Sequence, residues 1–293
     1  MERCVRTTSS RRRTSPGSVS ERVSVWQPSL LMRARIGAWT VGQAFRGSLG
    51  VLPSVPEVRS MIVKARWRQF QRQRGLIQAA DGTVASVLES TIQHNSSPEW
   101  MFYANLSNRP DLLTRPLSSL NTVRQNAHRM SVLCVGARTE AELLSVAACG
   151  FPLSNVFAVD LFSYSPSIAV ADATALPFQD KRFDVVLLGW VLEFVPDYGR
   201  AICESWRVLR DGGLLALGAM YHPVTTDIDQ YQKVRHVVGR TWRPQSAGDI
   251  VEAIESATGD RIRQVFVSDI DPLDRDKRGD LLVIVGKGPK HER

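Results

Sequence analysis

The chain has 293 residues, of which 43% are hydrophobic, so it is long enough for one large domain with appendages or for two domains. Its formal net charge of +8 is concentrated at the N-terminal end. Residues 1–75 carry fifteen Lys and Arg against three acids, whereas residues 76–293 carry twenty-two against twenty-six. The body of the chain is therefore mildly acidic, which argues against nucleic-acid binding by that part.

The first sixty residues are predicted to be a disordered tail. Residues 1–60 are rich in Arg and Ser and contain few acids, a composition typical of segments without a packed core. The same composition is found in organelle transit peptides, so we expect a cytoplasmic protein with an organelle as the alternative. No apolar run is long enough to span a membrane. The cysteines show no metal-binding spacing and are Cys4, Cys134, Cys149 and Cys203.

Residues 61–128 are expected to form a helical cap over the ligand edge of the domain that follows. Apolar residues at helical spacing predict helices over 61–74, 83–94 and 117–128. Lys and Arg surround much of the first of these helices. It is therefore either a solvated part of the cap or a helix that binds a membrane surface or an anion.

Residues 131–160 follow the order strand, glycine turn, helix, strand, acid. A short apolar run ends at Gly136, Thr139 is positioned to cap the next helix, and the second strand ends at Asp160. Right-handed crossovers place the ends of parallel strands at one edge of a sheet, where ligands bind. An adenosine-containing ligand would then set its ribose against Asp160 and its anionic end near Arg138 and Thr139.

Strands and helices continue to alternate toward the C-terminal end. Strands are predicted at 184–189, 213–218, 262–268 and 281–286, with helices at 198–209 and 247–258. The run at 184–189 is continuously apolar, as expected for a central strand buried on both faces. Such alternation predicts an α/β fold and not an all-β fold.

Five segments have the character of known family motifs, namely VLCVGARTEAEL (132–143), VFAVD (156–160), VADATALPF (170–178), RFDVVLLGWVLEFVPD (182–197) and WRVLRDGGLLALG (206–218). Their order resembles the class I S-adenosylmethionine-dependent methyltransferases. The resemblance implies a Rossmann-like open, mostly parallel sheet flanked by helices over residues 129–288, with S-adenosyl-L-methionine as the cofactor. The chain would then have three parts: the tail 1–60, the cap 61–128 and this domain.

The resemblance also implies roles for individual residues at the sheet edge. Gly136 would let the backbone approach the methionine part of the cofactor, and Asp160 would bind the ribose hydroxyls. Asp172 and the backbone of Ala173 would bind the adenine amino edge. The segment that begins at Trp190 would flank the methyl group and the acceptor.

Two features depart from the family pattern. The usual Gly-x-Gly-x-Gly loop is here Gly136-Ala-Arg-Thr-Glu. Only eleven residues separate Asp160 from Asp172, which is too short for a strand preceded by a crossover helix. We therefore expect the loop 162–166 in place of that helix. The loop either covers the cofactor in an unusual way or marks a domain that has lost it.

Methyl transfer from a sulfonium depends mainly on proximity and alignment, and a base is needed only where the acceptor holds its proton. The candidate bases near strand ends are Glu193, Tyr221, His222 and His236, each with a structural role as the alternative. Residues 220–245 are longer than an ordinary connection and follow the fifth strand, so we predict a lid or an acceptor-binding segment there.

Methyl transfer from S-adenosyl-L-methionine to a small-molecule acceptor is the function that these features predict. The alternative is a non-catalytic, methyltransferase-like module that binds a nucleotide or a partner, which the glycine-poor loop and the missing helix favour. A nicotinamide-dependent oxidoreductase is a weaker third hypothesis, because no Gly-x-Gly-x-x-Gly turn follows the first strand.

Overall fold

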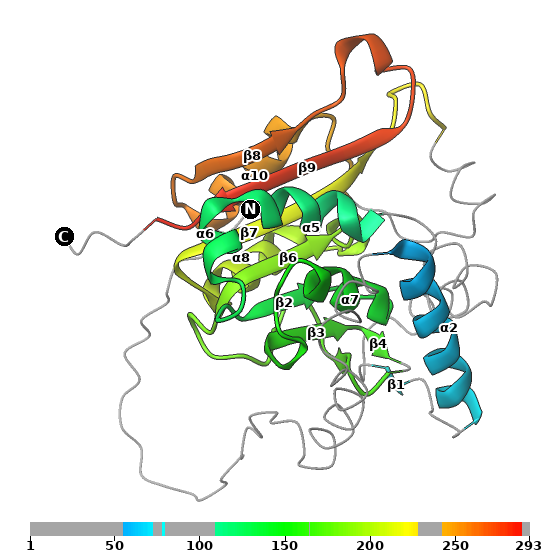
Figure 1. The fold of residues 1–293 in the computed structure, drawn as a ribbon. Helices are drawn as coiled ribbons and strands as arrows, with labels where there is room; N and C mark the ends of the chain where they lie inside the picture. Colours follow the sequence, from blue (N-terminus) through cyan, green and yellow to red (C-terminus); the bar gives the residue numbers. More distant parts are fainter. Residues whose placement is uncertain (1–54, 73–77, 80–108, 164, 228–241, 289–293) are drawn as a thin grey trace, which may run out of the picture.

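The computed structural model describes residues 55–72, 78–79, 109–163, 165–227 and 242–288 (Figure 1). Its main sheet is built from the strands β2 (Val132–Val135), β3 (Val156–Asp160), β5 (Ala169–Val170), β6 (Phe183–Gly189), β7 (Leu209–Tyr221), β8 (Arg263–Ser268) and β9 (Gly279–Gly286). They lie in the order β5-β3-β2-β6-β7-β9-β8. All pairs from β5 to β7 are parallel, and β9 runs antiparallel to both of its neighbours. The predicted open, mostly parallel sheet is confirmed.

Helices cover both faces of this sheet (Figure 1). The α-helices are α2 (Pro56–Arg72), α5 (Arg109–Ser119), α6 (Asn121–Asn126), α7 (Glu140–Ala148), α8 (Tyr198–Val208) and α10 (Ala247–Thr258). Single 3₁₀ turns occur at η3 (Leu153–Asn155), η4 (Leu192–Phe194) and η5 (Pro272–Asp274). Apolar residues of α5, α6 and α7 share one side of the core, and those of α8 and α10 share the other. The result is a three-layer α/β domain.

The central strands are buried on both faces, which explains their continuous apolar sequences. In β2, Leu133 and Val135 face the α8–α10 side, whereas Val132 and Cys134 face the α5–α7 side. The predicted central strand at 184–189 corresponds to β6, of which six of seven residues are buried. Parallel pairing of β2 with both β3 and β6 places these strands at the centre of the sheet.

The predicted helix over 117–128 is wrong in its bounds. The structure has two helices there, α5 ending at Ser119 and α6 beginning at Asn121, because Leu120 adopts an extended backbone. Pro116 lies inside α5 and does not end it. Apolar packing compensates for the lost hydrogen bond, since Leu113 and Leu117 of α5 are buried against the sheet.

Upstream of α5, the predicted helix over 61–74 corresponds to α2, which begins earlier, at Pro56. Proline suits the first turn of a helix, and Glu57 beside it suits the positive end of the helix dipole. α2 packs against α7. The predicted helix over 83–94 lies outside the described residues. In the part of the chain that the structure describes, no helix has the length and hydropathy needed to cross a membrane.

The expected absence of a helix between β3 and β5 is confirmed for the described residues of 161–168. This connection holds the short strand β4 (Phe162–Ser163) and a turn. β4 pairs with β1 (Gln78–Ala79) in a separate two-stranded sheet. β3 and β5 pair directly in parallel, with Asp160 opposite Val170. A loop of eight residues therefore makes a crossover that usually contains a helix.

Candidate functional site

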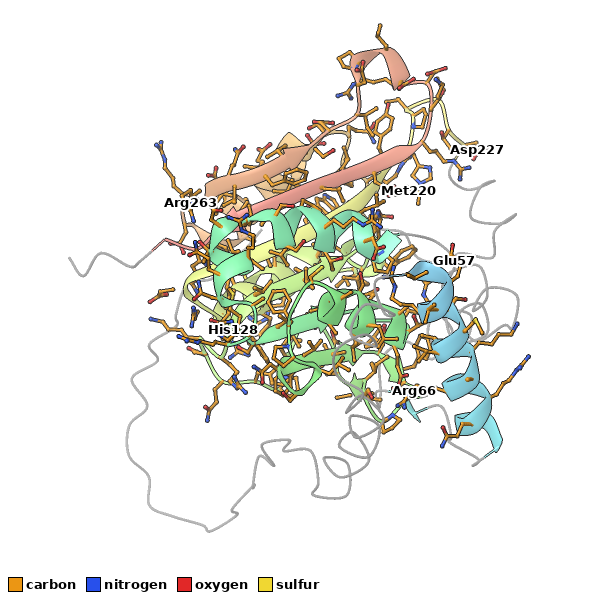
Figure 2. All side chains as sticks on the ribbon, in the orientation of Figure 1. Glu57, Arg66, His128, Met220, Asp227 and Arg263 are labelled. Atoms are coloured by element: carbon orange, nitrogen blue, oxygen red, sulfur yellow. The ribbon has the colours of Figure 1, made fainter. Side chains whose placement is uncertain are left out.

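The predicted site residues gather at the carboxyl edge of the parallel strands. Figure 2 shows His128, just before β2, and Met220, near the end of β7, at opposite ends of the sheet. The glycine turn follows β2, one acid ends β3, and Trp190 follows β6, all at the Met220 end. Topology thus brings together residues that are up to 54 positions apart in the chain.

The turn after β2 requires glycine for two reasons. Gly136 has φ +75°, a left-handed conformation, and a Cβ built on it would lie 2.4 Å from Cγ2 of Val191. The Gly136 N–H donates to the Val159 carbonyl of β3 at 2.8 Å, which ties the two strand ends together. The Val191 side chain is therefore the neighbour within the chain that leaves no space for a Cβ at this position.

The N-terminus of α7 is capped as predicted. The Thr139 hydroxyl accepts a hydrogen bond from the Ala141 N–H at 3.2 Å. The next residue, Glu140, is buried and pairs with Arg66 of α2, while the Ser165 hydroxyl donates to its carboxylate. A carboxylate of the chain itself thus stands at the positive end of this helix. An anionic ligand group near Thr139 would have Glu140 as a neighbour.

The two acids of the predicted adenosine site have different surroundings. Asp160 is half-buried, and its Oδ1 accepts from the Phe162 N–H at 3.4 Å. Burial raises the pKa of Asp160 from 3.8 to about 6, against the opposing effects of the Phe162 N–H and of Arg138. Asp172 instead accepts from the N–H and the hydroxyl of Thr174, both at 2.8 Å, and so stabilises the turn that holds buried Ala173.

Trp190 is fixed in an unusual conformation directly after β6. Its φ of +55° is rare for a bulky residue and is a form of local strain that clusters at functional sites. Its indole Nε1–H donates to Asp280 of β9 at 2.7 Å, and its main-chain N–H donates to the Gly218 carbonyl at 2.8 Å. The ring packs on Gly218, where a Cβ would approach to 3.3 Å.

Two of the candidate bases hold main-chain groups. β6 pairs with β7 as far as Gly218, and beyond that point buried Glu193 accepts from the Met220 N–H in place of a strand partner. The buried Tyr221 hydroxyl donates to the Arg275 carbonyl at 2.8 Å. His222, which follows, is buried as well. The structure therefore collects Glu193, Tyr221 and His222 at the end of β7.

The sequence analysis assigned no role in the site to three residues at this edge. Arg66 and Asp280 contact site residues that lie 74 and 90 positions away, so no local pattern identifies them. Glu142 is the third, and both of its carboxylate oxygens lie 3.9 Å from the position of a Cβ on Gly189. His236 lies outside the described residues, as does most of the predicted lid. Among the residues that the structure describes, no cluster of His, Cys, Asp and Glu could hold a metal ion.

The strand order, the antiparallel β9 between β7 and β8, and the glycine turn and acids after successive strands define the class I S-adenosylmethionine-dependent methyltransferase fold. Residues 133–217 match the model of a family described as a methyltransferase domain. This segment begins in β2 and ends in β7, and it is the part of the chain that is similar to methyltransferase domains.

Curated relatives match only part of this chain. It is 40% identical over 63 residues to a demethylmenaquinone methyltransferase of Staphylococcus saprophyticus, which covers 22% of this chain and 27% of the relative. It is 49% identical over 45 residues to a protein of the same name from Roseiflexus castenholzii, covering 15% and 19%. The alignments therefore span about a quarter and about a fifth of these relatives.

Solved structures with a similar arrangement are distant in sequence. The 1,6-didemethyltoxoflavin-N1-methyltransferase of Burkholderia thailandensis, solved with 1,6-didemethyltoxoflavin and S-adenosylhomocysteine, is 16% identical, with a TM-score of 0.45 over 73% of this chain and 95% of that one. A putative methyltransferase from Bacillus halodurans is 17% identical, with a TM-score of 0.43 over 59% and 100%.

Proposed function

We propose that this chain transfers a methyl group from S-adenosyl-L-methionine to a small-molecule acceptor. The observation that carries the proposal is the position of Asp160, at the end of β3 and beside the Gly136 turn, where the Gly136 N–H bonds to the strand that ends in Asp160. A carboxylate at this place has two oxygens with which to accept from the two ribose hydroxyls.

The residues at the edge suit the parts of this cofactor. Asp160 would hold the ribose, and the turn of Asp172 and Ala173 would hold the adenine edge. Arg138 is close enough to Asp160 to affect its pKa, and its guanidinium suits a carboxylate such as that of a methionine group. S-adenosylmethionine supplies an electrophilic methyl group on a sulfonium, so the chain has mainly to align the acceptor and exclude water. Buried Trp190 is placed to do both.

A base is required only for an acceptor that holds its proton, and we assign that role to the group of Glu193, Tyr221 and His222. Glu193 and Tyr221 also hold main-chain groups, so their removal would affect the fold together with the reaction. His222→Gln is therefore the substitution with which to begin, read as a change in kcat with an unchanged dissociation constant for the cofactor.

The acceptor is proposed only as a class. The curated relatives are named for demethylmenaquinone, but the matched stretches of 63 and 45 residues leave most of each relative without a counterpart. Because the match is short, a screen of acceptors should begin with demethylmenaquinone analogues and also include heteroaromatic amines and phenols. The screen records S-adenosylhomocysteine release, which does not depend on the identity of the acceptor.

A second candidate, a methyltransferase-like module that binds without catalysis, is favoured by one specific observation. The Val191 side chain occupies the space beside Gly136. The resemblance implied that the Gly136 backbone would approach the methionine part of the cofactor at this place. The two candidates differ in turnover: both predict binding of the nucleotide, and only the first predicts release of S-adenosylhomocysteine in the presence of an acceptor.

The first experiment is a thermal-shift titration of the full chain with S-adenosylmethionine, S-adenosylhomocysteine and NAD. A ligand at a hundredfold its dissociation constant stabilises by about 2.7 kcal/mol, a shift of roughly 5–10 °C for a domain of this size. We expect the first two ligands to give that shift and Asp160→Ala to lose it. Glu252→Ala, which removes an exposed acid from α10, is the matched control. Stabilisation by NAD alone would contradict the proposal.

A further inference from the structure

The N-terminal segment 56–79 reaches the loop 161–168 by a chain of charged and polar side chains. Arg66 of α2 pairs with Glu140 in the first turn of α7, with an Nη2 to Oε1 distance of 3.0 Å and a second contact through Nε. The Ser165 hydroxyl donates to the same Glu140 carboxylate. The Glu140 side chain is only 6% exposed, so removal of these partners would leave a buried carboxylate with fewer hydrogen bonds.

The same segment reaches the loop a second time through the backbone. β1 pairs antiparallel with β4, with Gln78 opposite Ser163 and Ala79 opposite Phe162. β4 begins two residues after Asp160. In Figure 1, α2, β1 and β4 lie together at one end of the molecule, and in Figure 2 Arg66 is on the side of α2 that faces them. Two independent contacts therefore meet on one loop.

Within the loop, hydrogen bonds among three serines connect Ser165 with β4, which follows the end of β3. Ser163 Oγ accepts from the Ser165 N–H at 3.1 Å and donates to the Ser165 carbonyl at 2.7 Å, and Ser165 Oγ accepts from the Ser167 N–H at 3.1 Å. Phe162, next to Ser163, donates its N–H to Asp160. A shift of Ser165 would therefore move the group that orients the Asp160 carboxylate.

We propose that α2 and β1 together take the structural place of the missing crossover helix, and that Arg66 and Glu140 are positioning residues which hold the loop 161–168 and, through it, Asp160. This inference rests on the proposed function, since it assigns Asp160 to the ribose. The N-terminal helix α2 is then part of the cofactor site by its effect on the loop.

The test measures cofactor affinity in the full chain by isothermal titration calorimetry at a temperature well below unfolding. The probes are S-adenosylhomocysteine and 5′-methylthioadenosine, which keeps the adenosine but lacks the amino-acid group. We expect Arg66→Ala to raise both dissociation constants about tenfold, equivalent to about 1.4 kcal/mol, and by the same factor, because the effect acts at the ribose. Arg66→Lys keeps the charge and should restore part of the affinity.

Arg68→Ala is the matched control, because Arg68 lies on the same helix with an exposed side chain, and it should leave both constants unchanged. Equal affinities for wild type and Arg66→Ala would overturn this inference and leave the proposed function intact. A wild-type chain that binds neither probe would overturn both. A loss confined to S-adenosylhomocysteine would also overturn the inference, because it would place the effect at the amino-acid end.

Hydrogen–deuterium exchange of the protein without ligand separates positioning from general stability. Arg66→Ala should speed the exchange of amides in 161–168 while those of β6, in the centre of the sheet, stay as protected as in wild type. Equally faster exchange in β6 would show a loss of stability throughout the domain and would overturn the positioning role.

Discussion

Burial opposes the ionisation of the Asp160 carboxyl group. Its pKa rises from 3.8 to about 6, so between these values the folded chain binds more protons than the unfolded chain. The contribution of this group to stability is therefore greatest at low pH and is lost as the pH rises through about 4 to 6. The ionised carboxylate is the form that accepts hydrogen bonds from the ribose hydroxyls. Cofactor affinity should therefore increase as the pH rises through the same range.

Asp160→Asn should consequently stabilise the unliganded protein more at pH 7.5 than at pH 4.5, since the amide is never charged. Urea unfolding at the two pH values measures the difference in midpoint between variant and wild type. Asp276→Asn, at an exposed position, should give no such pH-dependent difference. The same small effect of Asp160→Asn at both pH values would contradict the raised pKa.

Trp190 gives a second prediction at the scale of the residue. Asp280→Ala removes the acceptor of a buried indole N–H and should cost about 1–3 kcal/mol of unfolding free energy. Asp280→Asn keeps an acceptor oxygen and should cost clearly less. Urea unfolding followed by tryptophan fluorescence measures both, and an equal loss in the two variants would show that the charge, and not the hydrogen bond, holds the ring.

Residues identified from their position at a strand end were found where the sequence predicts them. Gly136 and Asp160 follow short apolar runs, and their neighbours in the chain determine their place. Asp280 and Arg66 could not be found in this way, because each acts on a residue more than seventy positions away. Neither the strain at Trp190 nor the main-chain bond of Glu193 has any signal in sequence spacing.

At the scale of the element, capping residues predicted the start of α7, whereas the bounds of α2, α5 and α6 depend on packing. Thr139 was predicted as a cap, and its side chain accepts from an N–H in the first turn of α7. The Asp197 side chain makes the same kind of contact at the start of α8. The break at Leu120 was missed, and packing of Leu113 and Leu117 keeps Pro116 inside α5. Tertiary contacts outweigh a single residue's propensity in such cases.

The buried Asp111 carboxylate joins three helices and pairs with two arginines that differ in exposure. Asp111 of α5 binds Arg59 of α2 at 2.7 Å and accepts from Ser145 of α7 at 2.6 Å, and it also pairs with Arg115 at 3.2 Å. The Arg59 side chain is 3% exposed and that of Arg115 is 68% exposed. The same carboxylate oxygen thus has one buried and one solvated partner.

Arg59→Met should therefore destabilise the protein by about 3–5 kcal/mol, because it breaks a buried ion pair. Arg115→Met, which breaks an exposed pair at the same acid, should cost less than about 1 kcal/mol. Chemical denaturation of the two variants beside wild type measures the difference. Similar losses in both would mean that burial does not determine the strength of this contact.

At the scale of the whole molecule, the sequence predicted the three layers and most strand positions. Strands buried on both faces have continuous apolar runs, and these are readable without a structure. The sheet order is less accessible, because β9 enters between two strands that precede it in the chain. Only long-range pairing, with Ala216 of β7 opposite Ile284, fixes that position.

The place of β9 has a consequence for synthesis on the ribosome. β7 ends at Tyr221 and β9 begins at Gly279, so about 60 residues must be translated before the open side of β7 gains its partner, a delay of roughly 3–12 s at about 5–20 residues per second. β8 has no partner in the sheet during that time, since it pairs only with β9. A nascent chain that stalls after β8 presents the open side of β7 and an unpaired β8, a form prone to aggregation and dependent on chaperones.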